Sequence, residues 1–232
     1  MIRSTLMATV ALSPLLLTPA VAQQTFDLGT IALSSSLSPV ELGRTGTTVE
    51  VLEGVDSGGN DTSVIKRLDR LPGVNSTSNG GLGTSGNIQV RGLPSRYVGV
   101  RVNGIDVSDP SSTQAQFNFG GLTPSGIERV EVLKGSQSAL YGSESIAGVV
   151  NISTFTPEEM GFSGTAQAEG GSFDTYSGSF SAGYRAERGF IAFSYGRIET
   201  DGFSAQSFND EDDGFEQTTV DITAEYDATD TL

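Results

Sequence analysis

From Gly161 onward the sequence alternates apolar and polar residues with a period of two. In the last alternating segment, Val220, Ile222, Ala224 and Tyr226 are separated by polar or charged residues. A period of two puts successive side chains on opposite faces of a β-strand, so each segment has one apolar face. The predicted strands, each of about ten residues, are 161–170, 174–184, 189–199 and 217–227. The C-terminal part therefore predicts an antiparallel sheet.

Two architectures fit this alternation. Outer-membrane β-barrels have strands of about ten residues with short periplasmic turns and long outer loops. The connection 185–189 is short, whereas 200–216 is long and acidic. Tyr176, Tyr184 and Tyr195 stand near strand ends, where the aromatic girdles of such a barrel lie. A soluble antiparallel sandwich alternates in the same way and is the competing interpretation.

Composition narrows the function. The chain has 13 Lys and Arg against 28 Asp and Glu, a formal charge of −15, which argues against nucleic acid as a partner. It has no Cys and no His, so thiolate chemistry, a Ser-His-Asp triad, disulfides and the common zinc sites are excluded. We therefore expect no catalytic residues and no enzyme activity.

The N-terminus predicts export. Residues 1–22 carry Arg3, then an apolar stretch, then Ala20-Val21-Ala22, as in a cleaved signal peptide. Residues 23–46 are polar and predict a flexible segment that contains an apolar patch, 26–33. Such a patch could pair with the sheet edge of another protein, or it could be the first strand of the following domain.

Residues 47–155 predict a small domain of strands and short helices. Asn103-Gly104, flanked by β-branched runs, is a strong hairpin signal. Polar loops are expected at 75–86 and 109–121. The other expected elements are strands at 47–52, 87–92, 98–102, 105–107, 127–133 and 148–153, a helix within 61–71 capped by Asp61 or Thr62, and a helical turn at 138–141.

Several stretches carry a family resemblance. The segment Ile127-Glu128-Arg129-Val130-Glu131-Val132-Leu133-Lys134-Gly135, continued through Ser138-Ala139-Leu140-Tyr141-Gly142 to Ile146-Ala147-Gly148-Val149-Val150-Asn151-Ile152, resembles the plug domain of TonB-dependent outer-membrane receptors. Leu71-Pro72-Gly73-Val74, Ile88-Gln89-Val90-Arg91-Gly92 and Val102-Asn103-Gly104-Ile105 resemble its earlier motifs, in the expected order. Within the family, the vitamin B12 receptor branch is the most similar. The implied fold is an α+β plug domain followed by antiparallel transmembrane β-barrel strands.

The resemblance implies a transport function in the outer membrane of a Gram-negative bacterium, with its lipid around the barrel. A TonB-type energy transducer in the periplasm would pull on the plug and release a scarce nutrient, cobalamin or a ferric siderophore. The TonB box would be Asp27, Leu28, Gly29, Thr30, Ile31, Ala32 and Leu33, although Gly29 and Ala32 depart from its β-branched pattern. By position, ligand contacts would come from Ser85, Asn87, Pro94, Ser112 and Thr113. Ordinary loop composition is the competing interpretation.

The acidic loop 201–213 predicts a cation site. Asp210-Glu211-Asp212-Asp213 gathers carboxylates beside Asp201, and flexible oxygen ligands suit Ca²⁺. The resemblance implies calcium at Glu211 and Asp213, whereas Ser204 stands where a further acid is expected. A solvated acidic loop is the alternative.

Charged plug residues have two interpretations. Arg91, Glu128, Arg129 and Glu131 could form ion pairs that hold the plug in the barrel wall, as the resemblance implies, or they could lie on solvated strand faces.

Chain length limits the barrel. A wall of roughly 22 strands needs at least about 200 strand residues, and 161–232 supplies only the first strands. We expect the N-terminal part of a receptor: signal peptide 1–22, N-terminal segment 23–46, plug 47–155 and an incomplete barrel from 161. The alternative is a secreted or periplasmic plug-like binding module followed by a soluble β-meander.

Overall fold

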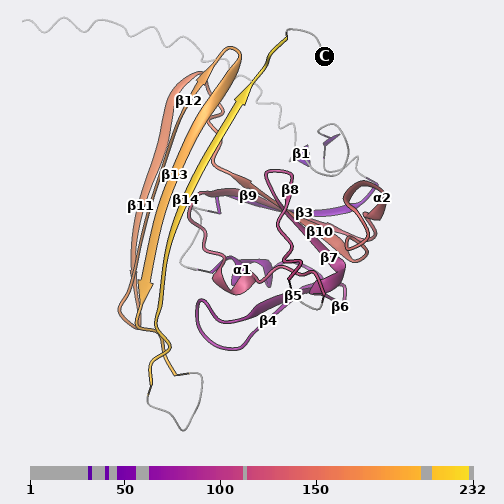
Figure 1. The fold of residues 1–232 in the computed structure, drawn as a ribbon, viewed down its shortest axis with the longest axis vertical. Helices are drawn as coiled ribbons and strands as arrows, with labels where there is room; N and C mark the ends of the chain where they lie inside the picture. Colours follow the sequence, from indigo (N-terminus) through magenta and orange to yellow (C-terminus); the bar gives the residue numbers. More distant parts are fainter. Residues whose placement is uncertain are drawn as a thin grey trace, which may run out of the picture.

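A computed structural model describes the protein over residues 31–32, 40–41, 46–55, 63–111, 114–204 and 211–229. The predicted signal peptide and most of the 23–46 segment lie outside these ranges. Within that segment, β1 (Ile31–Ala32) pairs antiparallel with β2 (Val40–Glu41). In Figure 1 a compact domain lies beside a long four-stranded sheet. We call these two parts the plug and the wall.

The centre of the plug is a five-stranded sheet. Its spatial order is β3 (Thr48–Glu53), β9 (Ile127–Lys134), β10 (Gly148–Thr154), β7 (Val98–Val102) and β8 (Ile105–Asp106). β10 runs parallel to β7, and the other neighbours are antiparallel. The sequence predicted all five strands within two residues at each end.

Both faces of this sheet are covered. Val130 and Val132 of β9 lie in the main core with α1 (Val64–Leu68). On the opposite face Leu133 packs with Val49 and Val149, with Tyr141 of α2 (Ser138–Tyr141) against them. A strand buried on two faces carries apolar residues on both of them, as Val130 and Val132 on one face of β9 and Leu133 on the other do.

The predicted hairpin and helical turn are confirmed, and the predicted helix is shorter than expected. Asn103 (φ 49°) and Gly104 (φ 80°) form the turn between β7 and β8 with positive φ angles, as a type I′ turn requires. α1 begins after its N-cap Ser63, and the amide of Val64 donates to the carbonyl of Leu122 at 3.2 Å, while the predicted caps Asp61 and Thr62 lie outside the described residues.

One loop prediction was wrong. Residues 75–86 begin with a strand, because β4 (Val74–Ser78) pairs antiparallel with β5 (Gly86–Val90), which also pairs with β6 (Leu93–Pro94). A short helical turn, η2 (Ser95–Tyr97), follows, and η3 (Phe119–Gly121) ends the loop predicted at 109–121. The polar side chains of β4 hid the strand, since tertiary pairing with β5 overrides a weak local preference.

The wall is an open antiparallel meander. β11 (Gly161–Gly171), β12 (Thr175–Ala186), β13 (Gly189–Thr200) and β14 (Phe215–Tyr226) pair in sequence order. A 12-residue strand such as β13 spans about 40 Å. The four predicted strands are confirmed, and the sheet is not closed. Figure 1 shows it standing along one side of the plug.

Candidate functional site

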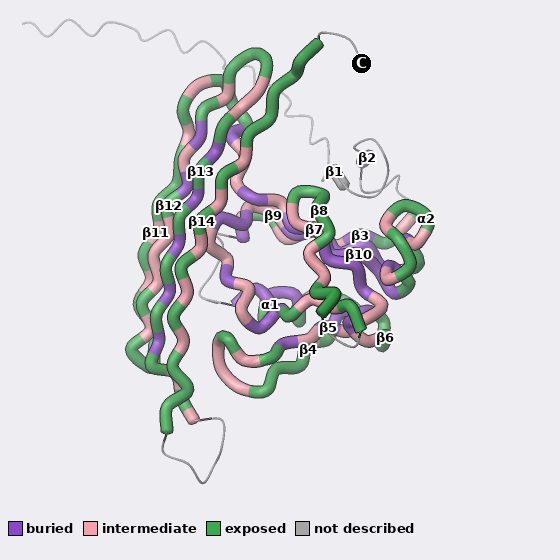
Figure 2. Tube along the Cα trace, in the orientation of Figure 1, coloured by how far each residue is buried: buried purple, intermediate pink, exposed green. Residues whose placement is uncertain are grey.

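The wall has an apolar outer face that is exposed. Ile222 is 68% exposed and Phe162 76%, whereas Ser181 on the inner face is fully buried. Figure 2 shows this alternation along β13 and β14, where exposed residues interleave with buried or intermediate ones. A soluble sheet directs its apolar face to a core. Here the polar face is covered by the plug, so the soluble β-meander alternative is wrong.

Register defines an apolar band on that outer face. Tyr184 pairs with Ile191, and Phe180 pairs with Tyr195, which pairs with Val220. All five side chains are exposed.

The band ends at a charged row on the side of the long 201–214 connection. There, Arg197 forms ion pairs with Glu199 at 3.3 Å and Glu216 at 2.7 Å. The predicted girdle residues Tyr184 and Tyr195 lie within the band, whereas Tyr176 is paired with Glu199 in the charged region. Such a band flanked by aromatic residues is what a lipid-facing barrel surface presents.

Small residues bring the inner face of the wall against the plug. A Cβ at Gly196 would lie 2.3 Å from Cβ of Ser125, and one at Gly183 would lie 3.0 Å from Cγ of Pro157. A larger side chain at Gly196 would displace the plug, whereas one at Gly183 would displace Pro157 of the linker or the neighbouring strand β13.

A polar network joins the plug hairpin to the wall. Asn103 Nδ2 donates to Thr154 Oγ1 at 2.8 Å and lies 3.5 Å from Thr223 Oγ1 on β14. The Thr154 amide donates back to Asn103 Oδ1 at 3.0 Å. The hairpin turn is therefore hydrogen-bonded to the plug's last strand and reaches the wall.

Charged residues of β9 form ion pairs within the plug. Arg129 bonds Glu131 at 2.8 Å and Glu53 at 3.0 Å, and the Glu131 side chain is buried. Lys134, also buried, bonds Glu50 at 2.9 Å. These ion pairs lie within the plug, and the interpretation that charged plug residues also hold the plug in the barrel wall stays a prediction. Neighbouring strand β3 supplies Glu53 and Glu50, and its register sets Glu53 opposite Arg129.

The other two predicted charges also have partners in the domain. Arg91 donates to Thr48 Oγ1 at 3.0 Å. Glu128 Oε2 accepts the amide of Thr156 at 3.0 Å, in the linker to the wall. Burial, with the nearby charge of Glu158, raises the pKa of Glu128 above its ordinary value.

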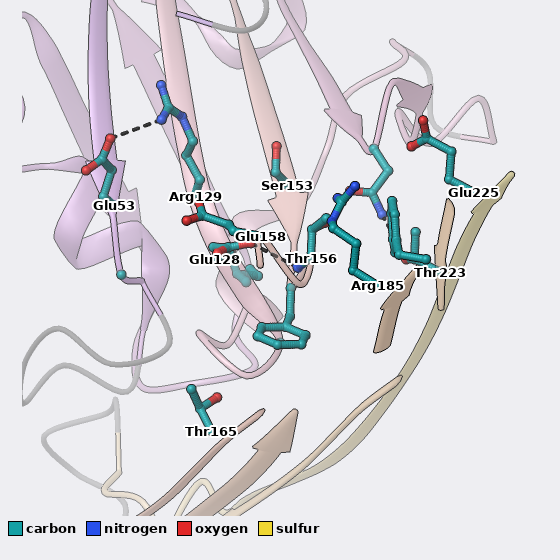
Figure 3. Close-up of a pocket in the computed structure, with 16 residues that line it drawn as sticks. Glu53, Glu128, Arg129, Ser153, Thr156, Glu158, Thr165, Arg185, Thr223 and Glu225 are labelled. Carbon is teal, nitrogen blue, oxygen red and sulfur yellow. Dashed lines mark hydrogen bonds and ion pairs between the residues drawn. The ribbon is translucent and has the colours of Figure 1, made fainter. Parts of the chain in front are cut away.

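A pocket of about 660 Å³ lies between plug and wall. Figure 3 shows the residues around it, including the Glu53–Arg129 ion pair. Its polar lining combines plug residues Glu53, Glu128 and Arg129 with wall residues Arg185, Thr223 and Glu225. It lies toward the end of the wall that carries the short 187–188 turn, which the sequence predicts to be periplasmic. The pocket therefore lies at the predicted periplasmic end of the plug–wall interface.

The predicted ligand residues gather on the small sheet at the opposite end. Asn87 is in β5 and Pro94 is in β6, while Ser85 immediately precedes β5. The buried hydroxyl of Ser95 lies 3.2 Å from Asn87 Oδ1 and 3.2 Å from Gln116 Oε1. Ser112 and Thr113 lie outside the described residues. The structure thus brings three of the five predicted residues together, and their role in binding stays a prediction.

Sequence reasoning missed Ser95, Gln116 and Asn118 as the supports of this surface. Asn118 Oδ1 accepts the amides of Gly86 at 2.9 Å and Gly120 at 3.0 Å. An Asn before Phe-Gly-Gly is a capping signal that identifies the turn but not its distant partner.

The calcium and TonB-box predictions are only partly covered. Glu211 and Asp213 are exposed at the start of the approach to β14, and Asp210 is not described. Among the described residues, no three acidic side chains gather closely enough to hold a metal ion. Of the box, the structure describes Ile31 and Ala32, in β1.

In the described part of the chain, no helix has the length and apolar character needed to span a membrane.

Comparison with known proteins defines the class. Residues 44–149 match the family model "TonB-dependent Receptor Plug Domain". The plug domain and adjoining wall therefore place this chain in the TonB-dependent receptor family.

Relatives within the family are transporters. The vitamin B12 transporter BtuB of Photobacterium profundum is 38% identical over 161 residues, which are 68% of this chain and 26% of that protein. BtuB of one Vibrio vulnificus strain is 33% identical over 141 residues, 61% of this chain and 23% of that protein. The chain thus spans about a quarter of the length of these curated relatives.

Solved structures share the fold. The siderophore receptor PirA from Acinetobacter baumannii aligns with a TM-score of 0.58 at 22% identity, covering 78% of this chain and 29% of that one. The copper transporter OprC gives a TM-score of 0.57 at 16% identity, covering 78% and 28%. The common architecture is a plug packed against barrel strands.

Proposed function

We propose that this chain forms the plug and first barrel strands of an outer-membrane receptor that takes up a cobalamin-class nutrient. The supporting observation is the wall, whose apolar face is exposed while its polar face is covered by the plug. In this arrangement lipid surrounds the wall and the plug blocks the lumen, so uptake requires the plug to move.

Cobalamin is favoured over a ferric siderophore by the sequence relatives. The transporters named for vitamin B12 are 38% and 33% identical, whereas the siderophore receptors that share the fold are below 25% identical. A ferric siderophore is the second candidate, and it makes the same demands on the plug.

The proposed energy source is a periplasmic TonB-type transducer that binds residues 27–33. A strand-forming patch near the N-terminus can add to the transducer's sheet through backbone hydrogen bonds. Proline at Ile31 removes a backbone donor and would block this addition.

Uptake of radiolabelled cyanocobalamin tests the proposal. The chromosomal gene of the source bacterium is deleted and complemented with wild type, Ile31→Pro or the control Ser35→Pro in the adjacent serine run. We expect wild type and Ser35→Pro to restore uptake, and Ile31→Pro to bind the vitamin at the cell surface without uptake. If the deletion strain still takes up cobalamin normally but loses uptake of a ferric siderophore, the siderophore is the transported nutrient. Equal uptake by Ile31→Pro and wild type would exclude residues 27–33 as the site that the transducer binds.

We also propose that calcium binds the 201–213 loop through Glu211 and Asp213. Both carboxylates are exposed, and oxygen ligands favour Ca²⁺ over softer metals. The double variant Glu211→Gln, Asp213→Asn should lose calorimetric Ca²⁺ binding, while Asp227→Asn at the far end of β14 should retain it. Unchanged binding in the double variant would refute the site.

A further inference from the structure

The plug loop that leads into the predicted ligand residues, 79–85, is held from behind by the plug itself. The amide of Gly83 donates to the carbonyl of Gly120 at 3.0 Å. A Cβ at Gly120 would lie 1.7 Å from the carbonyl oxygen of Thr84, so the loop and η3 touch backbone to backbone. This side of the loop has no freedom to accept a larger residue.

The wall holds the same loop from the front. Phe215, the first residue of β14, points to the inner face, and a Cβ at Gly83 would lie 2.2 Å from its Cδ2 and 2.6 Å from its Cε2. A Cβ at Gly81 would lie 3.6 Å from Cε1 of Phe203, whose ring packs against Phe173 at 5.3 Å. Two aromatic side chains that flank the long 201–214 connection, Phe203 and Phe215, therefore lie against this loop.

The contact joins two parts of the chain that are 132 positions apart, because Gly83 lies in the loop between β4 and β5 and Phe215 begins β14 of the wall. On the loop side, Gly83 has φ +81°, which favours glycine for the backbone alone. The ring of Phe215 adds an independent requirement, since the space in front of Gly83 is filled. Gly92, at φ +80° with nothing within 4 Å, shows that backbone shape does not by itself bring an aromatic ring.

We propose that Phe215 is a positioning residue for the ligand site. By packing on Gly83 it fixes loop 79–85 and thereby the direction in which Ser85 and Asn87 face the ligand. The inference rests on the proposed function for its ligand, a bulky cobalamin-class molecule, and adds that the barrel wall shapes the plug's ligand loop.

Binding of cyanocobalamin to the purified, full-length receptor tests the proposal through matched variants. Gly83→Ala clashes with Phe215, whereas Gly92→Ala imposes the same backbone strain in open space. We expect Gly83→Ala to raise Kd about tenfold or more, and Gly92→Ala to stay within about threefold of wild type. Phe215→Ala should also weaken binding, and the double variant Gly83→Ala, Phe215→Ala should bind better than Gly83→Ala because the space is restored.

A second readout does not depend on the ligand's identity. The chain has no cysteine, so Asn79→Cys gives a single site for a nitroxide spin label on the loop. The label should be more mobile in Phe215→Ala than in wild type, with an unchanged melting temperature. If wild type binds no cyanocobalamin while Phe215→Ala mobilises the label, the ligand assignment fails and the positioning role stands. Equal mobility, equal Kd for Gly83→Ala and Gly92→Ala, or no rescue in the double variant would each overturn the positioning role.

Discussion

The plug sheet and the wall sheet use similar residues for opposite surroundings. In the plug, Leu133 and Val132 are buried on opposite faces of β9, and the charges among them are paired. In the wall, Ile222 and Phe193 are exposed, and the face next to the plug is polar. A domain in water buries its apolar side chains, whereas a lipid-facing sheet exposes them on its outer face. The difference shows that the plug sheet suits an aqueous environment, whereas the outer face of the wall suits lipid.

The largest effect should follow from breaking the plug's buried ion pair. Arg129→Ala removes the ion pair that the guanidinium forms with the buried carboxylate of Glu131, at a cost of about 3–5 kcal/mol. The wall control Arg197→Ala removes exposed ion pairs and should cost at most about 1 kcal/mol. Chemical denaturation of the full chain in detergent measures both. Equal costs would contradict the distinction between a buried plug network and an exposed wall network.

A smaller effect should follow from separating the two sheets. Gly196→Val drives a side chain into Ser125 and should cost about 1–3 kcal/mol. Gly170→Val, on a wall strand with open space around it, is the control. Limited proteolysis of the plug should accelerate in the first variant alone. If both variants are digested at the same rate, the Gly196–Ser125 contact does not hold the plug.

The smallest effect concerns pH. Burial and the charge of Glu158 raise the pKa of Glu128, so the folded state holds its proton more tightly than the unfolded state. The resulting cost is absent below the ordinary value of 4.5 and grows as pH rises through the folded pKa. Glu128→Gln, which can keep the bond from Thr156, should therefore be slightly more stable than wild type at pH 7 and equal to it at pH 4. Melting curves at the two pH values measure this, with Glu225→Gln of the same pocket as control. If Glu128→Gln is less stable than wild type at pH 7, the buried carboxylate of Glu128 stabilises the fold there, contrary to this prediction.

Much of the fold could be predicted because its signals are local. The period of two in β13 and β14, the Asn103-Gly104 turn and the Ile- and Val-rich sequence of β9 each specify an element without reference to distant residues. β4 could not be predicted, since its polar sequence becomes a strand only beside β5. The partners of Arg129 were missed for the same reason, because pairing with Glu53 depends on the β3–β9 register.

The candidate site, too, has features that local sequence predicts and features that depend on packing between distant segments. The position of Asn87 on a strand could be predicted from alternation, but its buried neighbour Ser95 and the contact of Gly83 with Phe215 depend on how separate segments pack. A glycine in a polar loop gives no indication of the ring that lies against it.

The most direct test of whether the outer face of the wall contacts lipid is a charge placed on that apolar face. Ile222→Lys replaces a side chain that is 68% exposed, so a water-facing sheet would tolerate it, usually within about 0.5 kcal/mol. Thr218→Lys lies on the same face of β14, beside Arg197 in the charged row, and is the matched control. Equilibrium unfolding of the full-length receptor in lipid bilayers should show a loss of about 2–4 kcal/mol for Ile222→Lys and about 0–1 for Thr218→Lys. Equal stability of the two variants would contradict a lipid-facing wall.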